Sequence, residues 1–413
     1  MNLDQFLNRE GNRRQFLSRS ANAAGVAAAL VGLENAPARA SSADPVRVAV
    51  IGVRAWGKDL LSELLNQPEA EVAALCDVDS SVLYGIRSEF GDRFKRLPKT
   101  VSDYRRLLDD SGIDAVFVAT PDHWHARIAR DACEAGKDVY VEAPIGQSLG
   151  EVADLATAVA QSKRVVQVGL QQRSGRHFQT AIEAIQQGAI GRVRMARAWV
   201  VHRRKPIGTK TESTPPKGTD YAAWLGPAPA RPFHPNRYHQ NWQWYWDYGG
   251  GELSRWGVHF LDVAAWGLGV DRPNRVLATG GIFELEDDRE TPDTLTVHYE
   301  YPGAMIQWEH RQWSSHGIEG RTAGTAFYGS EGTLVVDRGG WKVYDRKDSL
   351  TADATDLLGP HIANFLRCVR TRETPTAPIE VGRLASELVH LGNLAYRNGA
   401  SVSPASLLES PVA

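Results

Sequence analysis

Residues 46–79 read VRVAVIGVRAWGKDLLSELLNQPEAEVAALCDVD, and this stretch decides the fold of the first part of the chain. It opens with a short, valine-rich apolar run, residues 46–51, of the kind that forms a buried parallel strand. A turn with two glycines (residues 52–57) follows, then leucines at helical spacing over residues 58–66, then a second apolar run that ends at Asp77. A strand, a glycine turn, a helix, a strand and an acid in this order are typical of dinucleotide-binding units.

The individual residues of this unit predict how a dinucleotide would be held. Gly52 allows a sharp turn out of the strand, Gly57 allows close helix packing, and the helix N-terminus offers free N–H groups to a pyrophosphate. Asp77 can accept hydrogen bonds from a ribose, and its charge repels a 2′-phosphate, so we expect NAD rather than NADP. Arg54 stands where the fingerprint has its middle glycine, and it can either add charge near the phosphates or obstruct them.

Length, charge and cysteine content narrow the class of protein. The 413 residues are enough for two domains with a sizeable core. A formal net charge of −2 predicts no nucleic-acid partner and no attraction to an acidic membrane surface. The three cysteines, Cys76, Cys133 and Cys368, are widely spaced and show no zinc pattern, and an odd count argues against a disulfide framework.

The first forty residues have the pattern of an export signal. Arg13 and Arg14 form a twin-arginine pair, a weakly apolar run covers residues 21–33, and Ala38-Arg39-Ala40 is a small-x-small cleavage site. We therefore predict a twin-arginine signal peptide over residues 1–40, a periplasmic protein, and no membrane attachment after cleavage. A tail or an uncleaved anchor is the alternative. Because this route carries folded proteins, we expect a cofactor that is loaded in the cytoplasm and stays tightly bound.

Strand and helix patterns alternate up to residue 169, which predicts a first domain over residues 46–169 with an open, mainly parallel sheet. Ligands bind outside the carboxyl ends of the strands in such sheets. Besides Gly52 and Asp77, the residues expected at those ends are Thr120, Pro121, Asp122, His123, Glu142, Ala143 and Pro144, the last in a peptide bond that can be cis.

Histidine is a common metal ligand, so His123 and His125 are candidate metal ligands by residue type. Two histidines without a set of carboxylate or thiol partners make a weak metal site, so we predict no metal. We expect one of them to cap a helix and the other to line the nicotinamide pocket.

The pattern changes at Gln171, and residues 170–413 form the predicted second domain. Residues 294–301 alternate cleanly between apolar and polar side chains, as in a half-buried antiparallel strand. With further strands nearby, they predict an open, mainly antiparallel sheet with helices on one face. Residues 205–235 are rich in proline, glycine and lysine and predict a long surface loop.

Residues 241–247, NWQWYWD, form an aromatic cluster. Tryptophan faces can stack on sugars while the flanking amides hydrogen-bond hydroxyl groups. The alternative is a packed cluster in the core or at a dimer interface. Farther on, the glycines at 249–251 lead into a predicted helix over residues 252–266. On it Arg255, His259 and Asp262 are spaced to share one face.

Several segments together resemble the Gfo/Idh/MocA oxidoreductases, over nearly the whole chain after the signal. They are the glycine turn 52–57, ATPDHWHA at 119–126, GKDVYVEAP at 136–144 and GELSRWGVHFLD at 251–262, in the family's order and spacing. The resemblance implies a Rossmann domain followed by a domain with an open antiparallel sheet. It also implies an NAD(P)-dependent enzyme for a sugar or sugar derivative, and a homo-oligomer.

The resemblance also implies a catalytic lysine and a catalytic aspartate, and both are missing. Ala143 stands at the lysine position, after the glutamate of the family's E-x-P segment, and Arg255 stands at the aspartate position, one turn before His259. Three hypotheses follow. Arg255 replaces the lost positive charge while His259 acts as the base, which suits an anionic substrate such as a uronate; or the chain is a redox-silent binding protein; or it modifies glycosides.

The candidate site therefore has three parts. The catalytic candidates are His259 and Arg255. The candidate substrate contacts are Gln171, Arg173, Trp246 and Asp262. The candidate cofactor contacts are Gly52, Arg54, Trp56, Gly57, Asp77, Thr120, Pro121, His123, His125, Glu142 and Pro144.

Overall fold

The structure, a computed structural model, describes residues 44–345 and 350–404. The predicted signal peptide, residues 1–40, lies outside the described residues. Among the described residues, no helix is long and apolar enough to cross a membrane.

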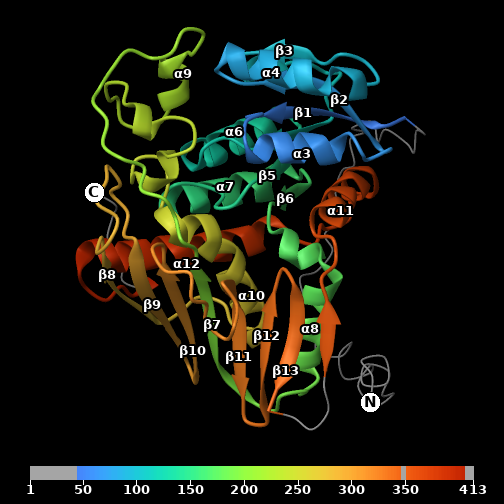
Figure 1. Ribbon diagram of the computed structural model, residues 1–413. Helices are drawn as coiled ribbons and strands as arrows, with labels where there is room; N and C mark the ends of the chain where they lie inside the picture. Colours follow the sequence, from blue (N-terminus) through green and yellow to red (C-terminus); the bar gives the residue numbers. More distant parts are fainter. Residues whose placement is uncertain (1–43, 346–349, 405–413) are drawn as a thin grey trace.

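A six-stranded sheet forms the first domain, with every strand parallel and in the order β3-β2-β1-β4-β5-β6 (Figure 1). This confirms the predicted Rossmann domain. The strands are β1 (Val46–Ile51), β2 (Ala70–Cys76), β3 (Lys99–Val101), β4 (Ala115–Val118), β5 (Asp138–Val141) and β6 (Val166–Val168). The helices that alternate with them are α3 (Trp56–Leu64), α4 (Ser80–Phe90), α5 (Arg105–Leu108), α6 (Asp122–Glu134) and α7 (Leu149–Ser162).

An eight-stranded sheet forms the second domain, in the order β14-β13-β12-β11-β7-β10-β9-β8. Its neighbouring strands are antiparallel except for the parallel pair β7 and β10, which confirms the predicted mainly antiparallel sheet. The strands are β7 (Val193–Val201), β8 (Arg275–Gly281), β9 (Thr294–Tyr301), β10 (Ala304–Arg311), β11 (Ala323–Gly329), β12 (Gly332–Asp337), β13 (Gly340–Tyr344) and β14 (Thr351–Asp353).

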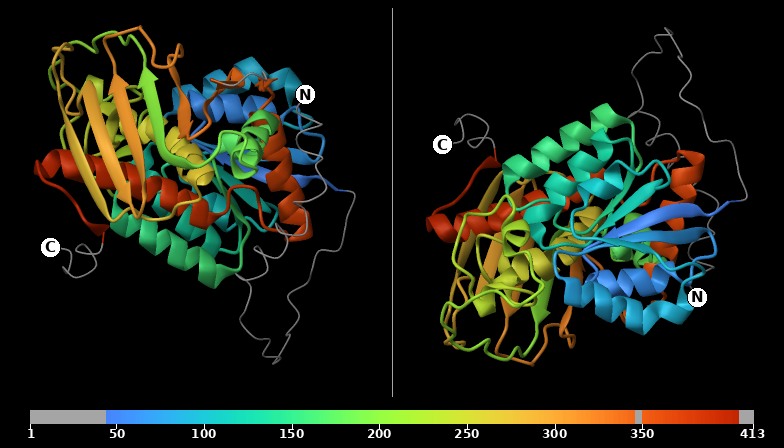
Figure 2. Two further views of the ribbon diagram at one scale, coloured as in Figure 1. Left: turned by 90° about the horizontal axis from the view of Figure 1, so that it is seen from below. Right: turned by 90° about the horizontal axis from the view of Figure 1, so that it is seen from above.

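Three helices cover one face of this second sheet: α8 (Arg176–Gln186), α10 (Val258–Leu268) and α12 (Ile379–Asn398). Figures 1 and 2 show α12 between the antiparallel sheet and the Rossmann layer, where it also contacts α7 and β6. The predicted alternation in β9 is confirmed, because Leu295, Val297 and Tyr299 are fully buried against this helical layer.

The helix α11 (Leu358–Thr371) leaves the second domain and packs on the first, beside α3 and β1 (Figure 1). Its Phe365 ring meets Phe117 of β4 edge-on, with the ring centres 5.3 Å apart. The core of the first domain is therefore completed by residues nearly two hundred positions beyond its last strand.

Several local predictions were incomplete. The strands β8 and β14 and the helix α8 were not predicted, and the helix predicted over residues 102–110 is reduced to α5. The helix predicted from residue 252 begins as a π-helix, Leu253–Gly257, before α10 continues it. The predicted surface loop, residues 205–235, is mostly irregular and contains one short helix, α9 (Tyr221–Leu225).

The close approach of β1 to α3 gives a stability prediction. A Cβ added at Gly57 would lie 1.9 Å from the carbonyl oxygen of Gly52, so Gly57→Ala must push the helix away from the strand. We expect the variant to lose about 1–3 kcal/mol of unfolding free energy, measured by urea denaturation. Gly85→Ala is the matched control, because Gly85 is an exposed position in α4 where an added Cβ meets no atom within 4 Å. That change should be neutral or stabilise by up to about 1 kcal/mol, and equal losses in both variants would contradict the prediction.

Candidate active site

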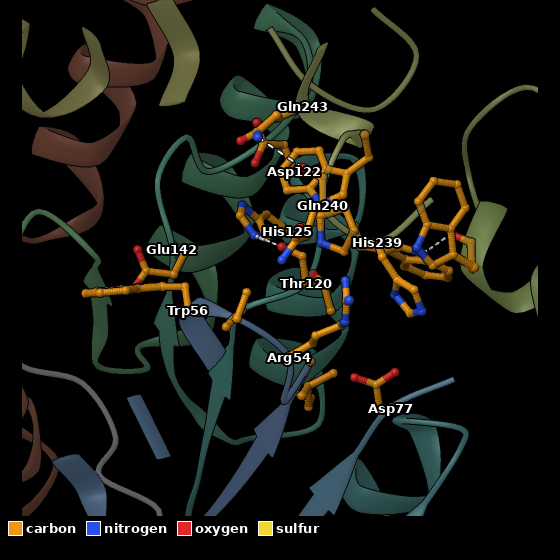
Figure 3. Close-up of a pocket in the computed structure, with 18 of the residues that line it drawn as sticks. Arg54, Trp56, Asp77, Thr120, Asp122, His125, Glu142, His239, Gln240 and Gln243 are labelled. Carbon is orange, nitrogen blue, oxygen red and sulfur yellow. Dashed lines mark hydrogen bonds between the residues drawn. The ribbon is translucent and has the colours of Figure 1, made fainter. Parts of the chain in front are cut away.

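A cavity of about 1320 Å³ lies between the two domains, at the carboxyl ends of the parallel strands. It is larger than the roughly 300–1,000 Å³ of a usual small-molecule pocket, so a dinucleotide and a second ligand can share it. Figure 3 shows Glu142 and Trp56 at one end of the view, Asp77 and His239 at the other, and Arg54 and Thr120 between them.

The glycine turn is shaped to leave backbone N–H groups free. Gly52 has a φ of 82°, and the non-glycine Ala55 has a φ of 47° and a ψ of −114°, a conformation that costs free energy for a residue with a side chain. Helix α3 starts directly after Ala55, whose side chain makes no capping hydrogen bond. The Gly57 and Lys58 N–H groups donate to the carbonyl oxygens of Arg54 and Ala55, whereas the Trp56 N–H has no partner among the described residues and remains available to an anionic ligand.

Asp77 follows β2 and faces the cavity. Its carboxylate accepts hydrogen bonds from the backbone N–H of Val53, at 3.2 Å, and of Asp79, at 3.0 Å. Burial raises the pKa of Asp77 to about 6. Hydroxyl donors of a ribose would favour the charged form, so the position suits the acid of a dinucleotide site.

Arg54 places its positive charge in the cavity near the same end. It opposes the rise in the pKa of Asp77 and contributes to the low pKa, about 4, that burial gives His239. The side chain thus lies within electrostatic reach of the site predicted for the phosphates and the ribose.

Glu142 is a buried acid at the end of β5. Trp56 and Tyr140 hydrogen-bond its carboxyl group, and Gln171 Nε2 donates to Oε1 at 3.2 Å. Burial raises the pKa of Glu142 to about 7 despite these hydrogen bonds. The group can therefore gain or lose a proton near neutral pH.

The two histidines of α6 are held by backbone carbonyls. His123 Nε2 lies 3.0 Å from the carbonyl oxygen of Trp224, and the two ring nitrogens of His125 each lie 2.7 Å from one, those of Pro144 and Thr120. Neither histidine caps α6, whose N-cap is Pro121, but His123 meets the Trp224 carbonyl in the last turn of α9 and so caps the C-terminal end of that helix. His125 lines the cavity and His123 does not.

The segment from Arg204 to Trp244 closes one side of the cavity. It is fastened to the corner between β2 and α4, where Ser80 N donates to Gly218 O and Asp220 N donates to Val78 O. The His239 ring also lies 3.1 Å from the carboxylate of Asp79. The dinucleotide end of the cavity is thus covered by chain from the second domain.

The side chains of the aromatic cluster at 241–247 are divided between the cavity wall and a buried core. Trp242, Gln243 and Trp244 line the cavity, and Trp244 also packs with Tyr245 in a buried aromatic core. Trp246 does not line the cavity, because its indole lies under Arg397, 5.1 Å away, and beside Tyr396.

The helix that carries His259 does not send all three predicted residues to the cavity. Arg255 and His259 line it, whereas Asp262 is buried and binds Arg173 through both carboxylate oxygens, at 2.7–3.1 Å. Arg173 in turn lies over the Trp266 ring, 4.8 Å from its centre. Asp262 and Arg173 therefore form a buried ion pair and not part of the cavity wall.

Two family models match this chain. An oxidoreductase family with an NAD-binding Rossmann fold matches residues 46–170, and its C-terminal alpha/beta domain matches residues 198–406. The chain belongs to the Gfo/Idh/MocA oxidoreductase family.

Individual proteins that are similar to part of this chain agree with that assignment. Inositol 2-dehydrogenase 1 of Saccharopolyspora erythraea is 33% identical over 148 residues, 35% of this chain and 43% of that protein. Glycosyl hydrolase family 109 protein 2 of Shewanella sp. (strain ANA-3) is 30% identical over 178 residues, 41% of this chain and 39% of that protein. The chain thus matches only about two-fifths of the length of these relatives.

Solved structures share the fold. An oxidoreductase from Agrobacterium radiobacter, in complex with NAD⁺, L-tartaric acid and magnesium, has a TM-score of 0.67 and 16% identity over 88% of this chain and 99% of that one. Together with the family model, this neighbour supports a nucleotide cofactor.

Against the family pattern, the catalytic end of the cavity is unusual. Ala143 and Arg255, at the positions where the family resemblance places lysine and aspartate, both line the cavity. Burial, Arg338 and His361 lower the pKa of His259 to about 3, so its ring is neutral at physiological pH. Its Nδ1 is buried and has no hydrogen-bond partner among the described residues, which leaves Nε2 to face a ligand.

Two residues that line the cavity, Asp122 and Arg338, were not among the candidate site residues, although Asp122 was expected at a strand end. Asp122 begins α6 and lines the cavity, and burial raises its pKa well above the usual range. Arg338 reaches the cavity from the turn between β12 and β13. For Asp122, its place after the predicted strand end at Pro121 was an available signal, whereas nothing in the local pattern marks Arg338.

The predicted site residues divide into two groups. Those that line the cavity are Gly52, Arg54, Trp56, Asp77, Thr120, Pro121, His125, Glu142, Gln171, Arg255 and His259. Those that do not are Gly57, which packs on Gly52; Pro144, in a cis peptide bond as expected; and His123, Arg173, Trp246 and Asp262.

The raised pKa of Glu142 gives a pH prediction. The stabilisation from its neutral form is fully present below about pH 4.5 and is lost as the pH rises through about 7. Glu142→Gln stays neutral throughout. We compare the unfolding free energies of the cofactor-free variant and the cofactor-free wild type. As the pH rises from about 5 to about 8, we expect this difference to shift in favour of the variant by up to about 3 kcal/mol. Glu134→Gln, at a side chain that is 66% exposed, is the control and should change little. Parallel pH profiles for wild type and Glu142→Gln would contradict the assignment.

Proposed function

We propose that this family member is an NAD(P)-dependent oxidoreductase that acts on a sugar or sugar derivative, with NAD as the favoured cofactor. The observation that carries the proposal is a single cavity with Asp77 and the glycine turn in one part and His259 in another. The family assignment and the inositol dehydrogenase relative support the substrate class.

The residues present fit a pyridine dinucleotide. The positive φ of Gly52, the Trp56 N–H at the start of α3 and the facing carboxylate of Asp77 are parts that such a ligand needs, and this N–H has no partner among the described residues. The Thr120 hydroxyl is buried in this region and has no hydrogen-bond partner among the described residues. NAD is favoured over NADP because Asp77 repels a 2′-phosphate.

The remaining steps belong to side chains of this chain. When bound, the nicotinamide supplies the acceptor for a hydride. His259 Nε2 receives the hydroxyl proton of the substrate, and Arg255 supplies the positive charge that stabilises the developing oxyanion in place of the missing lysine. Trp242 and Trp244, in the covering segment, help to exclude water from the cavity.

Purified full-length protein tests this proposal through two variants. We expect wild-type protein to bind NAD and to reduce it with at least one sugar of a broad panel, followed at the absorbance band of the reduced nicotinamide. His259→Ala should keep NAD binding and lose at least about a hundredfold in turnover, because it removes the base. Asp77→Ala should weaken NAD binding by about tenfold or more, measured by calorimetry.

His298→Ala is the control, because His298 lies in β9 and does not line the cavity. If cofactor-stripped protein bound neither NAD nor NADP, the proposed oxidoreductase function would be refuted. NAD binding with no turnover in wild type and His259→Ala would favour a redox-silent binding protein. Cleavage of a glycoside without net NAD reduction would favour the third hypothesis, which the family 109 relative supports.

We also infer that the protein is exported to the periplasm with its cofactor bound. The twin-arginine pattern at Arg13 and Arg14 supports export, and the covering segment fastened at Gly218 and Asp220 supports slow loss of the cofactor. Changing Arg13 and Arg14 to lysine should leave the protein in the cytoplasm with its signal uncleaved, shown by fractionation and mass spectrometry. Unchanged periplasmic protein would contradict this. The homo-oligomer expected from the family stays a prediction.

A further inference from the structure

Two arginine side chains face the His259 part of the cavity without a counterion. Arg255 lies one turn before His259, and the Arg338 guanidinium lies 4.7 Å from the centre of the Trp256 ring. Within residues 44–345 and 350–404, neither guanidinium makes an ion pair or a hydrogen bond. Water can reach both through the cavity, yet enclosure by protein lowers the pKa of each. Two unpaired positive charges that line the same cavity favour an anionic ligand there.

The nearby carboxylates do not cancel these charges. Glu252 is fully buried and already bound to Arg204, at 2.6 Å, so its charge is satisfied. Burial raises the pKa of Asp122 far above its usual range and that of Glu142 to about 7, so both carry less negative charge than ordinary carboxylates. This part of the cavity is therefore positive at neutral pH.

The position of the two arginines separates them from the sites of the cofactor phosphates. Arg338 acts electrostatically on His259 and Glu142, and Arg255 acts on Asp122 and Glu252. The glycine turn has its own positive side chains, Arg54 and Lys58, which also line the cavity. A ligand held by Arg255 and Arg338 would lie beside the base.

We propose that Arg255 and Arg338 form an arginine clamp for a carboxylate of the substrate, so that the enzyme acts on a sugar acid, such as a hexuronate or an aldonate, in preference to a neutral sugar. This deepens the proposed function and rests on it. A guanidinium matches a carboxylate with two parallel hydrogen bonds, and the Trp256 ring beneath Arg338 holds that side chain in place.

The chemistry stays that of carbinol oxidation. The carbon–hydrogen bond of the carbinol gives a hydride to the oxidised nicotinamide, the hydroxyl proton goes to His259, and a carbonyl forms. The carboxylate in the clamp is unchanged. The negative charge of the carboxylate offsets the positive charge of Arg338, which is one of the groups that lower the pKa of His259. Binding of an acid therefore raises this pKa and makes His259 a stronger base.

Calorimetry on NAD-loaded, full-length protein tests the clamp with matched pairs of probes. The pairs are D-glucuronate and D-glucose, D-galacturonate and D-galactose, and D-gluconate and D-glucitol. We expect at least one acid to bind about tenfold or more tightly than its neutral partner, with an affinity that falls as salt increases. Arg338→Ala should remove this preference and leave the affinity for the neutral sugar within about threefold. Arg255→Ala should also remove the preference, and it should lower turnover as well because Arg255 stabilises the developing oxyanion.

Arg397→Ala is the matched control, because Arg397 also stacks on a tryptophan but does not line the cavity. Its acid preference should equal that of the wild type. Arg338→Gln replaces Arg338→Ala if thermal unfolding shows that the alanine variant is not folded.

The clamp is overturned if no acid binds more tightly than its partner, or if Arg338→Ala weakens NAD binding and not acid binding, which would assign the arginine to the cofactor. Failure of the proposed function has a different signature, because an acid would then bind in a clamp-dependent manner without being oxidised.

Discussion

The close contact between the first strand and the first helix is the constraint on which the site depends. The backbone of Gly57 lies against the carbonyl of Gly52, and Gly52 itself lies against Ala119 at the end of β4, so neither position has room for a Cβ atom. This contact starts α3 directly above the ends of the parallel strands, where the Trp56 N–H has no partner among the described residues. Asp77 follows β2 and Thr120 follows β4, the two strands that flank β1. Because these strands end at the same level, both residues reach the same cavity.

Around His259 the second domain supplies positive charge, whereas the first domain brings the buried acids Asp122 and Glu142 to this part of the cavity. Arg255 comes from a π-helix, Arg338 from a hairpin turn and Arg204 from the end of β7, and all three line one cavity with Glu142. Only Arg204 has a carboxylate partner there. A family member without the lysine therefore keeps positive charge near its histidine, but on side chains from the second domain. The site is made by the contact between the domains and not by either one alone.

The sequence could predict what is local. The strand β9 was predicted with its observed bounds, because the alternation of apolar and polar side chains is written in consecutive residues. Arg255 and His259 share the cavity as predicted, but the place of Asp262 could not be predicted, because its partner, Arg173, lies 89 positions away in the sequence. Arg338 was missed for the same reason. Its role depends on where a hairpin of the second sheet ends in space, and no motif reports that.

The return of α11 to the first domain has a consequence for synthesis. Residues 358–371 supply Ile362, Phe365 and Leu366 to the core around β1 and Tyr140, so a ribosome must make nearly the entire polypeptide before that core is closed. A nascent chain that ends after β6 would expose this apolar surface to water. The nucleotide-binding half therefore cannot mature ahead of its partner, and both halves must reach their final state as one post-translational event.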